Sequence, residues 1–171
     1  LRHIHERVAA SGEPTILHED KSMMIVNKPA GVPTLDDIAG LNNVVSLMQA
    51  LTGNLSLRPA NRLDRVTSGV LLLAKGGHQQ RKVMAMLEQR QLTKVYLARV
   101  KGVLDQPIEY SARIIYNQRA RRAELAEEGK ESRTDFRTLK EFEDGTSLVE
   151  CVLHSGKRHQ IRCHLAALGH P

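Results

Sequence analysis

Apolar residues in the first part of the chain form short runs that are separated by turn residues. The segments TILHED (15–20) and SMMIVNKPAG (22–31) are typical of two strands joined by a charged turn, the second leading into a Pro-Gly loop. A further apolar run at 69–74 is bounded by turn residues and predicts a short buried strand.

Apolar residues with helical spacing occur at 42–51 and at 78–91. The first of these helices is short, and Asn42 or Asn43 is its candidate N-cap. The final HQIRCHLAALG (159–169) is predicted to pass from a strand or loop into a short helix.

Beyond residue 92 the pattern becomes β-rich, because apolar and polar residues alternate. The segment RARRAELAEEGK (119–130) is dense in charge and predicts a solvated loop or hairpin tip, and contact of its three arginines with RNA is the alternative. Strands therefore come before, between and after helices, which predicts an α+β fold with a mixed, largely antiparallel central sheet flanked by helices and loops. The four strands predicted in this part of the chain are 93–101, 108–116, 132–141 and 147–154.

Composition limits the classes of partner and the cellular compartment that the chain is expected to have. Lys and Arg total 25 against 19 Asp and Glu, so 25 − 19 gives a formal charge of +6, with a pI near 9.6. Such an excess favours a polyanion partner, nucleic acid above all, although a cationic surface that serves solubility alone is the alternative. No apolar run reaches about 18 residues, so no membrane association is expected. Two cysteines give no disulfide framework and indicate a reducing, intracellular compartment, the cytoplasm first and an organelle second.

A metal site is the first chemical alternative. Cys151, His154, His159 and Cys163 are all residue types that bind zinc. In a strand at 147–154, however, residues three apart point to opposite faces, and Cys151 fits the alternation as a core residue. No metal is therefore expected. Neither G-x-G-x-x-G nor a Walker lysine loop is present, and no spacing indicates a Ser-His-Asp arrangement.

NRLDRVTSG (61–69) places one carboxylate, Asp64, between two arginines, Arg62 and Arg65. One interpretation is an Asx-turn, in which the Asp64 side chain accepts the amide of Val66 or Thr67. The other is chemical, because flanking arginines favour an ionised carboxylate that can act as a nucleophile or an electrostatic stabiliser. The spacing alone leaves both interpretations open.

Four separated motifs resemble the RluA-type family of RNA pseudouridine synthases, and they stand in the family's order. EDKSMMIVNKPAGVPT resembles the first motif, and NRLDRVTSGVLLLAKG resembles the second, usually His-Arg-Leu-Asp-x-x-Thr-Ser-Gly. LTKVYLARVKG is similar to the Lys-x-Tyr strand, and LHSGKRHQIRCHLAALGHP to the Thr-Gly-Arg-x-His-Gln-Ile-Arg-x-His motif. The resemblance extends over residues 14–171.

The resemblance implies roles for individual residues. Asp64 matches the essential catalytic aspartate, and Tyr96 the tyrosine that packs against the target base. Arg162 matches the arginine that ion-pairs with the catalytic carboxylate, and Arg62 the arginine implicated in extruding the base. The remaining expected RNA- or substrate-binding positions are Lys28, Asn61, Arg158, His159 and Gln160.

The implied reaction is the isomerisation of specific uridines in structured RNA, tRNA or rRNA, to pseudouridine, with base flipping and without a cofactor. A catalytically inactive RNA-binding module on the same fold is the alternative. Asn61 stands where the family usually has His, for which we expect a tuning effect on activity.

The expected protein is a monomer with a single catalytic domain over residues 1–171, of which 1–13 is an N-terminal extension. The family usually continues beyond the final LGHP, so the end of the domain is expected to be missing.

Overall fold

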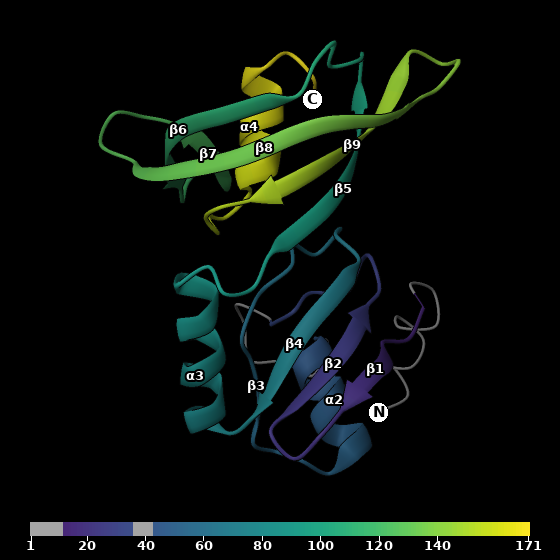
Figure 1. Cartoon of the computed structure of the whole chain (residues 1–171). Coiled ribbons are helices and arrows are strands. Elements are labelled where there is room, and N and C mark those ends of the chain that lie inside the picture. The colour runs from purple at the N-terminus through teal and green to yellow at the C-terminus, as the bar shows by residue number, and fades with distance from the viewer. Residues whose placement is uncertain (1–11, 36–42) are drawn as a thin grey trace. The chain divides into compact units, whose positions relative to one another are not determined.

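The computed structural model describes residues 12–35 and 43–171 of the chain, so most of the predicted extension and the candidate cap Asn42 lie outside the described residues. The chain divides into two compact units, Leu1–Gln89 and Arg90–Pro171 (Figure 1). The prediction of a single domain stays a prediction, because compactness does not measure whether the two units fold together.

The first unit holds a four-stranded antiparallel sheet in the order β1-β2-β4-β3, with two helices (Figure 1). Its elements are β1 (Thr15–Glu19), β2 (Met23–Lys28), α2 (Val44–Thr52), β3 (Leu57–Pro59), β4 (Gly69–Lys75) and α3 (Gly77–Glu88). Asn43 caps α2, since its side chain accepts the Ser46 amide at 2.8 Å, as the sequence predicted.

Alternation along β2 and β4 builds the core of this unit. Met24 pairs with Leu73 and Val26 with Leu71, and none of the four side chains has exposed surface. Val44, Val45 and Met48 of α2 complete the same apolar cluster. Continuing the alternation places Lys28 on this buried face, at the point where β2 ends.

The second unit holds a five-stranded antiparallel sheet in the order β5-β9-β8-β6-β7, and α4 lies against one face of it (Figure 1). Its elements are β5 (Lys94–Lys101), β6 (Ile108–Asn117), β7 (Arg122–Leu125), β8 (Lys130–Glu141), β9 (Thr146–Leu153) and α4 (Gln160–Ala167). Phe136, Val149 and Cys151 form the core with Leu165 of α4. The face of the sheet that packs on α4 is thus the apolar one.

The predicted α+β class is confirmed, and so are the two helices in the first half of the chain. Among the described residues the strands pair antiparallel throughout, in agreement with the predicted largely antiparallel arrangement, and they are divided between two sheets. Hydrophobic alternation shows which face of a strand is buried but not which strand is its partner. β3 and β7 were not predicted as strands, because one has three residues and the other is largely polar.

Candidate active site

The loop that carries Asp64, residues 61–68, is held on both sides of the aspartate by the segment that follows β2. On one side the Thr34 hydroxyl donates to the Leu63 carbonyl at 3.0 Å and accepts the Leu63 amide at 3.1 Å. On the other side the Gly31 amide donates to the Arg65 carbonyl at 2.8 Å, while Arg65 Nε donates to the Gly31 carbonyl at 2.9 Å. These contacts fix the main chain at 63 and at 65, and so position Asp64 between them.

Lys28 lies beneath this loop with no exposed surface. Its ammonium group donates to the carbonyls of Pro29 at 2.9 Å, Val32 at 2.5 Å and Arg65 at 3.2 Å. Burial lowers the pKa of Lys28 to about 8, while the nearby charge of Asp64 acts in the opposite direction. The Lys28 side chain, which was predicted to bind substrate, thus donates its hydrogen bonds to the protein's own carbonyls. Its position makes it a support for the loop.

Asn61 also uses its side chain to hold the main chain. Its Oδ1 accepts the Leu72 amide at 2.8 Å, and its Nδ2 donates to the Val70 carbonyl at 3.3 Å. Together with the Ala60 amide, which donates to the Leu72 carbonyl at 2.8 Å, these bonds continue the β3–β4 ladder past the end of β3. An amide can do this because it carries both a donor and an acceptor.

The turn after Asp64 is closed by the main chain, since the Thr67 amide donates to the Asp64 carbonyl at 3.0 Å. The Asx-turn interpretation, in which the Asp64 side chain accepts an amide of the same turn, stays a prediction. Asp64 is half-buried and Arg62 is exposed. Arg65, which resembles Arg62 in the sequence, differs from it in the structure because its side chain clasps the loop.

In the second unit, Tyr96 lies on β5 with its side chain on the face that packs against α4. It pairs in register with Cys151 of β9, which pairs in turn with Phe136 of β8. The ring is half-buried and packs against the core cluster. A rigid sheet therefore holds this tyrosine at the edge of the core.

Gln160, the first residue of α4, is 2% exposed and has all of its amide hydrogen-bonding groups engaged. Its Oε1 accepts from the Ser155 hydroxyl at 2.8 Å and the Lys157 amide at 3.0 Å. Its Nε2 donates to the Arg133 carbonyl at 3.0 Å and to the Thr134 hydroxyl at 2.9 Å. Gln160 thus ties the loop before α4 to strand β8, and the hydrogen bonds indicate a positioning role for its side chain.

His164, one helical turn beyond Gln160, continues this set of bonds and was not among the residues predicted from the sequence. Its Nε2 lies 2.9 Å from the Ser132 hydroxyl, which itself donates to the Ala112 carbonyl at 2.6 Å. A hydroxyl has one proton, so His164 must donate from Nε2, and Nδ1 must accept from the Thr134 hydroxyl at 3.0 Å. His164 has no exposed surface, and burial lowers its pKa to about 4. The ring is therefore neutral, with its tautomer fixed by its neighbours.

Arg158, His159 and Arg162 lie around the start of α4. The Arg158 guanidinium stacks over the Tyr116 ring at 4.0 Å from its centroid, and the His159 ring meets the same tyrosine edge-on at 5.5 Å. Arg162 is exposed, since it stands two residues from both Gln160 and His164, which occupy the buried face of the helix. The network on the buried face thereby sets the direction in which Arg162 projects.

The predicted site residues are divided between the two units. The first unit contributes Lys28, Asn61, Arg62 and Asp64, and the second contributes Tyr96, Arg158, His159, Gln160 and Arg162. The ion pair expected between Arg162 and Asp64 joins residues of different units and stays a prediction.

Two of the four candidate zinc ligands, Cys151 and His154, make other contacts in the structure. Cys151 is fully buried in the core, where burial raises the pKa of its thiol to about 12, so the thiolate needed for metal binding is disfavoured. His154 instead contacts Asp135 at 2.6 Å. Over residues 12–35 and 43–171, no three His, Cys, Asp or Glu side chains are grouped so as to hold a metal ion. In the same part of the chain, no helix combines the length and the apolar character that crossing a membrane requires.

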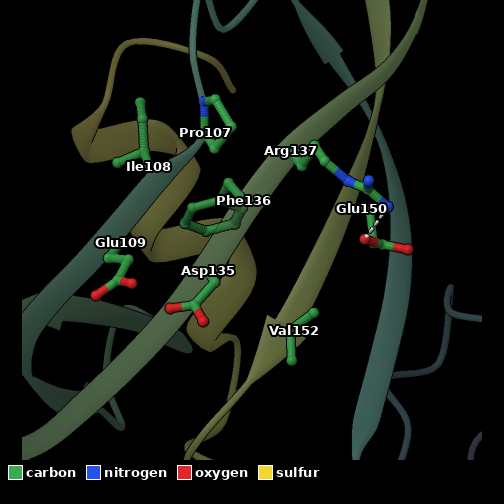
Figure 2. Close-up of a pocket in the computed structure, with 8 residues that line it drawn as sticks. All are labelled: Pro107, Ile108, Glu109, Asp135, Phe136, Arg137, Glu150 and Val152. Carbon is green, nitrogen blue, oxygen red and sulfur yellow. Dashed lines mark hydrogen bonds and ion pairs between the residues drawn. The ribbon is translucent and has the colours of Figure 1, made fainter.

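A depression of about 330 Å³ in the second unit presents polar side chains on the strand faces that point away from α4 (Figure 2). Three carboxylates line it, and each is paired: Glu109 with Arg133 at 2.8 Å, Asp135 with His154 at 2.6 Å, and Glu150 with Arg137 at 2.9 Å. The basic side chains at this depression are thus engaged with its carboxylates. Its lining consists of Pro107, Ile108, Glu109, Asp135, Phe136, Arg137, Glu150 and Val152.

Known proteins are similar to this chain over the part that holds the predicted site residues. A family model described as RNA pseudouridylate synthase matches residues 22–167. The mitochondrial tRNA pseudouridine(32) synthase of Saccharomyces cerevisiae is 33% identical over 177 residues, which cover 99% of this chain and 38% of the relative. The dual-specificity RNA pseudouridine synthase RluA of Yersinia pestis is 30% identical over 159 residues, which cover 91% of this chain and 77% of the relative.

Among solved structures, human RNA pseudouridylate synthase domain containing 1 is similar, with a TM-score of 0.79 and 26% identity. The similarity covers 93% of this chain and 66% of the human one. The chain therefore spans less than half of the yeast relative's length and about two thirds of the human chain. These comparisons confirm the predicted RluA-type resemblance.

Proposed function

Because this chain belongs to the RNA pseudouridylate synthase family, we propose that it takes part in converting uridine in RNA to pseudouridine. The match over residues 22–167 carries the proposal, since it includes every predicted site residue. The relatives are named for tRNA and for ribosomal RNA, so structured RNA of these classes is the proposed substrate. A cytoplasmic or organellar location and a monomeric state stay predictions.

In the proposed reaction the bond between N1 of uracil and C1′ of ribose breaks, and a bond between C5 and C1′ forms. C5 loses a proton and N1 gains one, so the isomerisation is balanced without an oxidant or a reductant. Asp64 is the proposed catalytic carboxylate, and the hydrogen bonds on either side of it keep its loop from needing to reorganise during the reaction.

Around Asp64 we assign further roles. Arg62 is exposed and is available to fill the space that a flipped base leaves, which offsets part of the few kcal/mol that unstacking costs. Tyr96 offers a ring held by the sheet for packing against uracil, and Arg162 offers a charge for the carboxylate. Lys28, Asn61 and Gln160 act through the main chain, as positioning residues.

Replacement of Asp64 by Asn tests the proposal. We expect tritium release from RNA labelled at C5 of uridine to fall by at least about 1000-fold, because the amide is a poor nucleophile. RNA binding, measured on filters, should stay within about threefold of the wild type. Asp105→Asn, at an exposed position, is the matched control and should retain full activity. Full activity of Asp64→Asn would overturn the catalytic role.

An inactive RNA-binding module is the second candidate, and the substitution of Asn for the usual His at position 61 favours it. This candidate predicts background tritium release from the wild type together with salt-sensitive RNA binding. The two hydrogen bonds of Asn61 argue for the active enzyme instead, because the amide still anchors the loop that carries Asp64.

A further inference from the structure

Arginines gather on the hairpin that joins β6 to β7. Arg119, Arg121 and Arg122 are all exposed there, and Glu124 is the one acidic residue between positions 117 and 124. Arg122 pairs with Glu124 at 2.8 Å. The guanidinium groups of Arg119 and Arg121 make no ion pair with any residue that the structure describes. The charges of Arg119 and Arg121 at the tip are therefore exposed to solvent and are not neutralised by a described residue.

The tip has a defined turn. The Asn117 side chain accepts the amides of Arg119 at 3.1 Å and Ala120 at 3.0 Å, and it donates to the Glu124 carboxylate at 3.3 Å. Arg121 takes a left-handed conformation, with φ of 52°, to reverse the chain. The arginines are thus displayed from an ordered turn, which lowers the entropic cost of binding through them.

The base of the hairpin is attached to the predicted site. Tyr116, the residue before Asn117, packs against Arg158 at 4.0 Å and against His159 at 5.5 Å. These two residues immediately precede α4, which carries Arg162. Arg158 is exposed, so it extends the positive surface of the tip toward the start of the helix.

Arginine suits this position because its guanidinium group can bind a phosphate through two parallel hydrogen bonds. The opposite chemistry occupies the face of the sheet that points away from α4, where the carboxylates of Figure 2 are paired with basic side chains. Arg119 and Arg121 therefore differ from the basic side chains of that face, each of which pairs with a carboxylate.

We propose that this hairpin, residues 116–124, is an arm that binds the sugar–phosphate backbone of RNA away from the target uridine. The inference rests on the proposed function in one respect, that the substrate is RNA. Arg119 and Arg121 contact phosphates, and Tyr116 transmits the position of the bound strand to the loop before α4. The arm supplies affinity rather than base recognition, since phosphate contacts carry no sequence information.

The double variant Arg119→Glu/Arg121→Glu tests the proposal, with Lys101→Glu/Lys140→Glu as the matched control. Both lower the formal net charge by four, and the control residues are exposed at the far end of β5 and β8. Filter binding of unfractionated tRNA is measured over a series of KCl concentrations. In the hairpin variant the slope of log K against log salt should become shallower by about 1.4–1.8, for two phosphates lost. The dissociation constant should rise at least about tenfold above that of the control.

Tyr116 supplies a second measurement. Tyr116→Phe keeps the ring and should bind tRNA as the wild type does, whereas Tyr116→Ala should weaken binding severalfold with the salt slope changed little. A hairpin variant whose slope and affinity match the control within about twofold would overturn the proposal. The arginines would then serve another polyanion, such as an acidic protein.

Tritium release by the wild type separates this inference from the proposed function. If the wild type releases no tritium and the hairpin variant loses tRNA binding, the proposal of an RNA-binding arm is supported and the proposal of enzymatic activity is contradicted. If the wild type is active and the hairpin variant binds tRNA as its control does, the proposal of an RNA-binding arm is contradicted and the proposal of enzymatic activity is supported.

Discussion

Lys28 shows how a charged side chain can serve a site without touching substrate. Its three acceptors are main-chain carbonyls from both segments that meet beneath Asp64, so one ammonium group joins them. A lysine reaches such a position because its long aliphatic stem can lie in an apolar core while its head bonds elsewhere. The nearby charge of Asp64 raises the pKa of Lys28 and so opposes the effect of burial.

Replacing Lys28 by Met should lower the free energy of unfolding by about 2–4 kcal/mol, because three buried carbonyls lose their donor. Met retains most of the volume, so the loss reports hydrogen bonds rather than a cavity. Lys21→Met, at an exposed position in the first unit, is the control and should change stability by less than about 0.5 kcal/mol. Urea unfolding measures both, and equal stabilities for the two variants would contradict the role of Lys28.

Asn61 makes a second prediction at this scale. Asn61→Ala removes the partners of the Leu72 amide and the Val70 carbonyl, and it should lower the free energy of unfolding by about 1–2 kcal/mol. Asn27→Ala, an exposed asparagine on β2, should have a much smaller effect in the same urea titration. If the two alanine variants were equally stable, the side chain of Asn61 would not be holding the loop to β4.

Helix α4 depends on polar groups as well as on apolar packing. Gln160, Thr134, His164 and Ser132 form one chain of hydrogen bonds in which each proton has a single possible direction. A helix held in this way is fixed against rotation, because turning it would break several buried bonds at once. Arg162, on the other face, is positioned as a consequence.

The neutral state of His164 predicts a dependence of stability on pH. In the folded protein the ring stays neutral down to its lowered pKa of about 4, whereas in the unfolded chain it takes up a proton below about 6.5. Stability is therefore fully present above pH 6.5 and falls as the pH drops toward 4, by at most about 3 kcal/mol. Urea unfolding at pH 7.0, 6.0, 5.0 and 4.5 measures this loss.

His164→Gln provides the comparison for that experiment. Burial acts to raise the pKa of Asp135, but its hydrogen bonds to His154 and Arg133 lower it overall, so protonation of this carboxylate in acid destabilises the wild type and the variant alike. The difference between wild type and variant thus isolates His164, and it should narrow steadily below pH 6.5. A constant difference across this range would mean that His164 takes up its proton in the folded protein at the same pH as in the unfolded chain.

At the scale of elements, periodicity predicted most of the secondary structure. It succeeded where a segment buries one face by itself, as in α3, in β4 and in the alternation of β9. It missed β7, whose residues RAEL owe their conformation to pairing with β6 rather than to burial. Such a strand depends on its neighbour, and no pattern within it shows the dependence.

The whole molecule contains a site that the sequence predicted in part. Asp64 stands out through its motif, and the alternation of Met24, Val26 and Lys28 already indicates that the lysine side chain turns inward. Nothing in the sequence marks Thr34, because its contact with Leu63 joins residues 29 positions apart. His164 had a faint signal, since it stands four residues after Gln160 on the same helical face.

Charge is also unevenly distributed over the molecule. The formal net charge of +6 does not show that carboxylates of the open sheet face are paired while the arginines at the tip of the β6–β7 hairpin are not. Composition therefore predicts a polyanion partner only as a class, whereas the arrangement of the strands indicates where the proposed partner would lie.

The way in which the Asp64 loop is attached has a consequence for protein engineering. The loop is held mainly through its peptide groups, which every amino acid carries, while the side chains of Arg62 and Val66 are exposed. Positions 62 and 66 can therefore be randomised in a library while the aspartate between them keeps its place. Side chains on either side of Asp64 can thus be varied without rebuilding the backbone that positions the proposed catalytic carboxylate, and loss of activity in variants of position 62 would report the role proposed for Arg62.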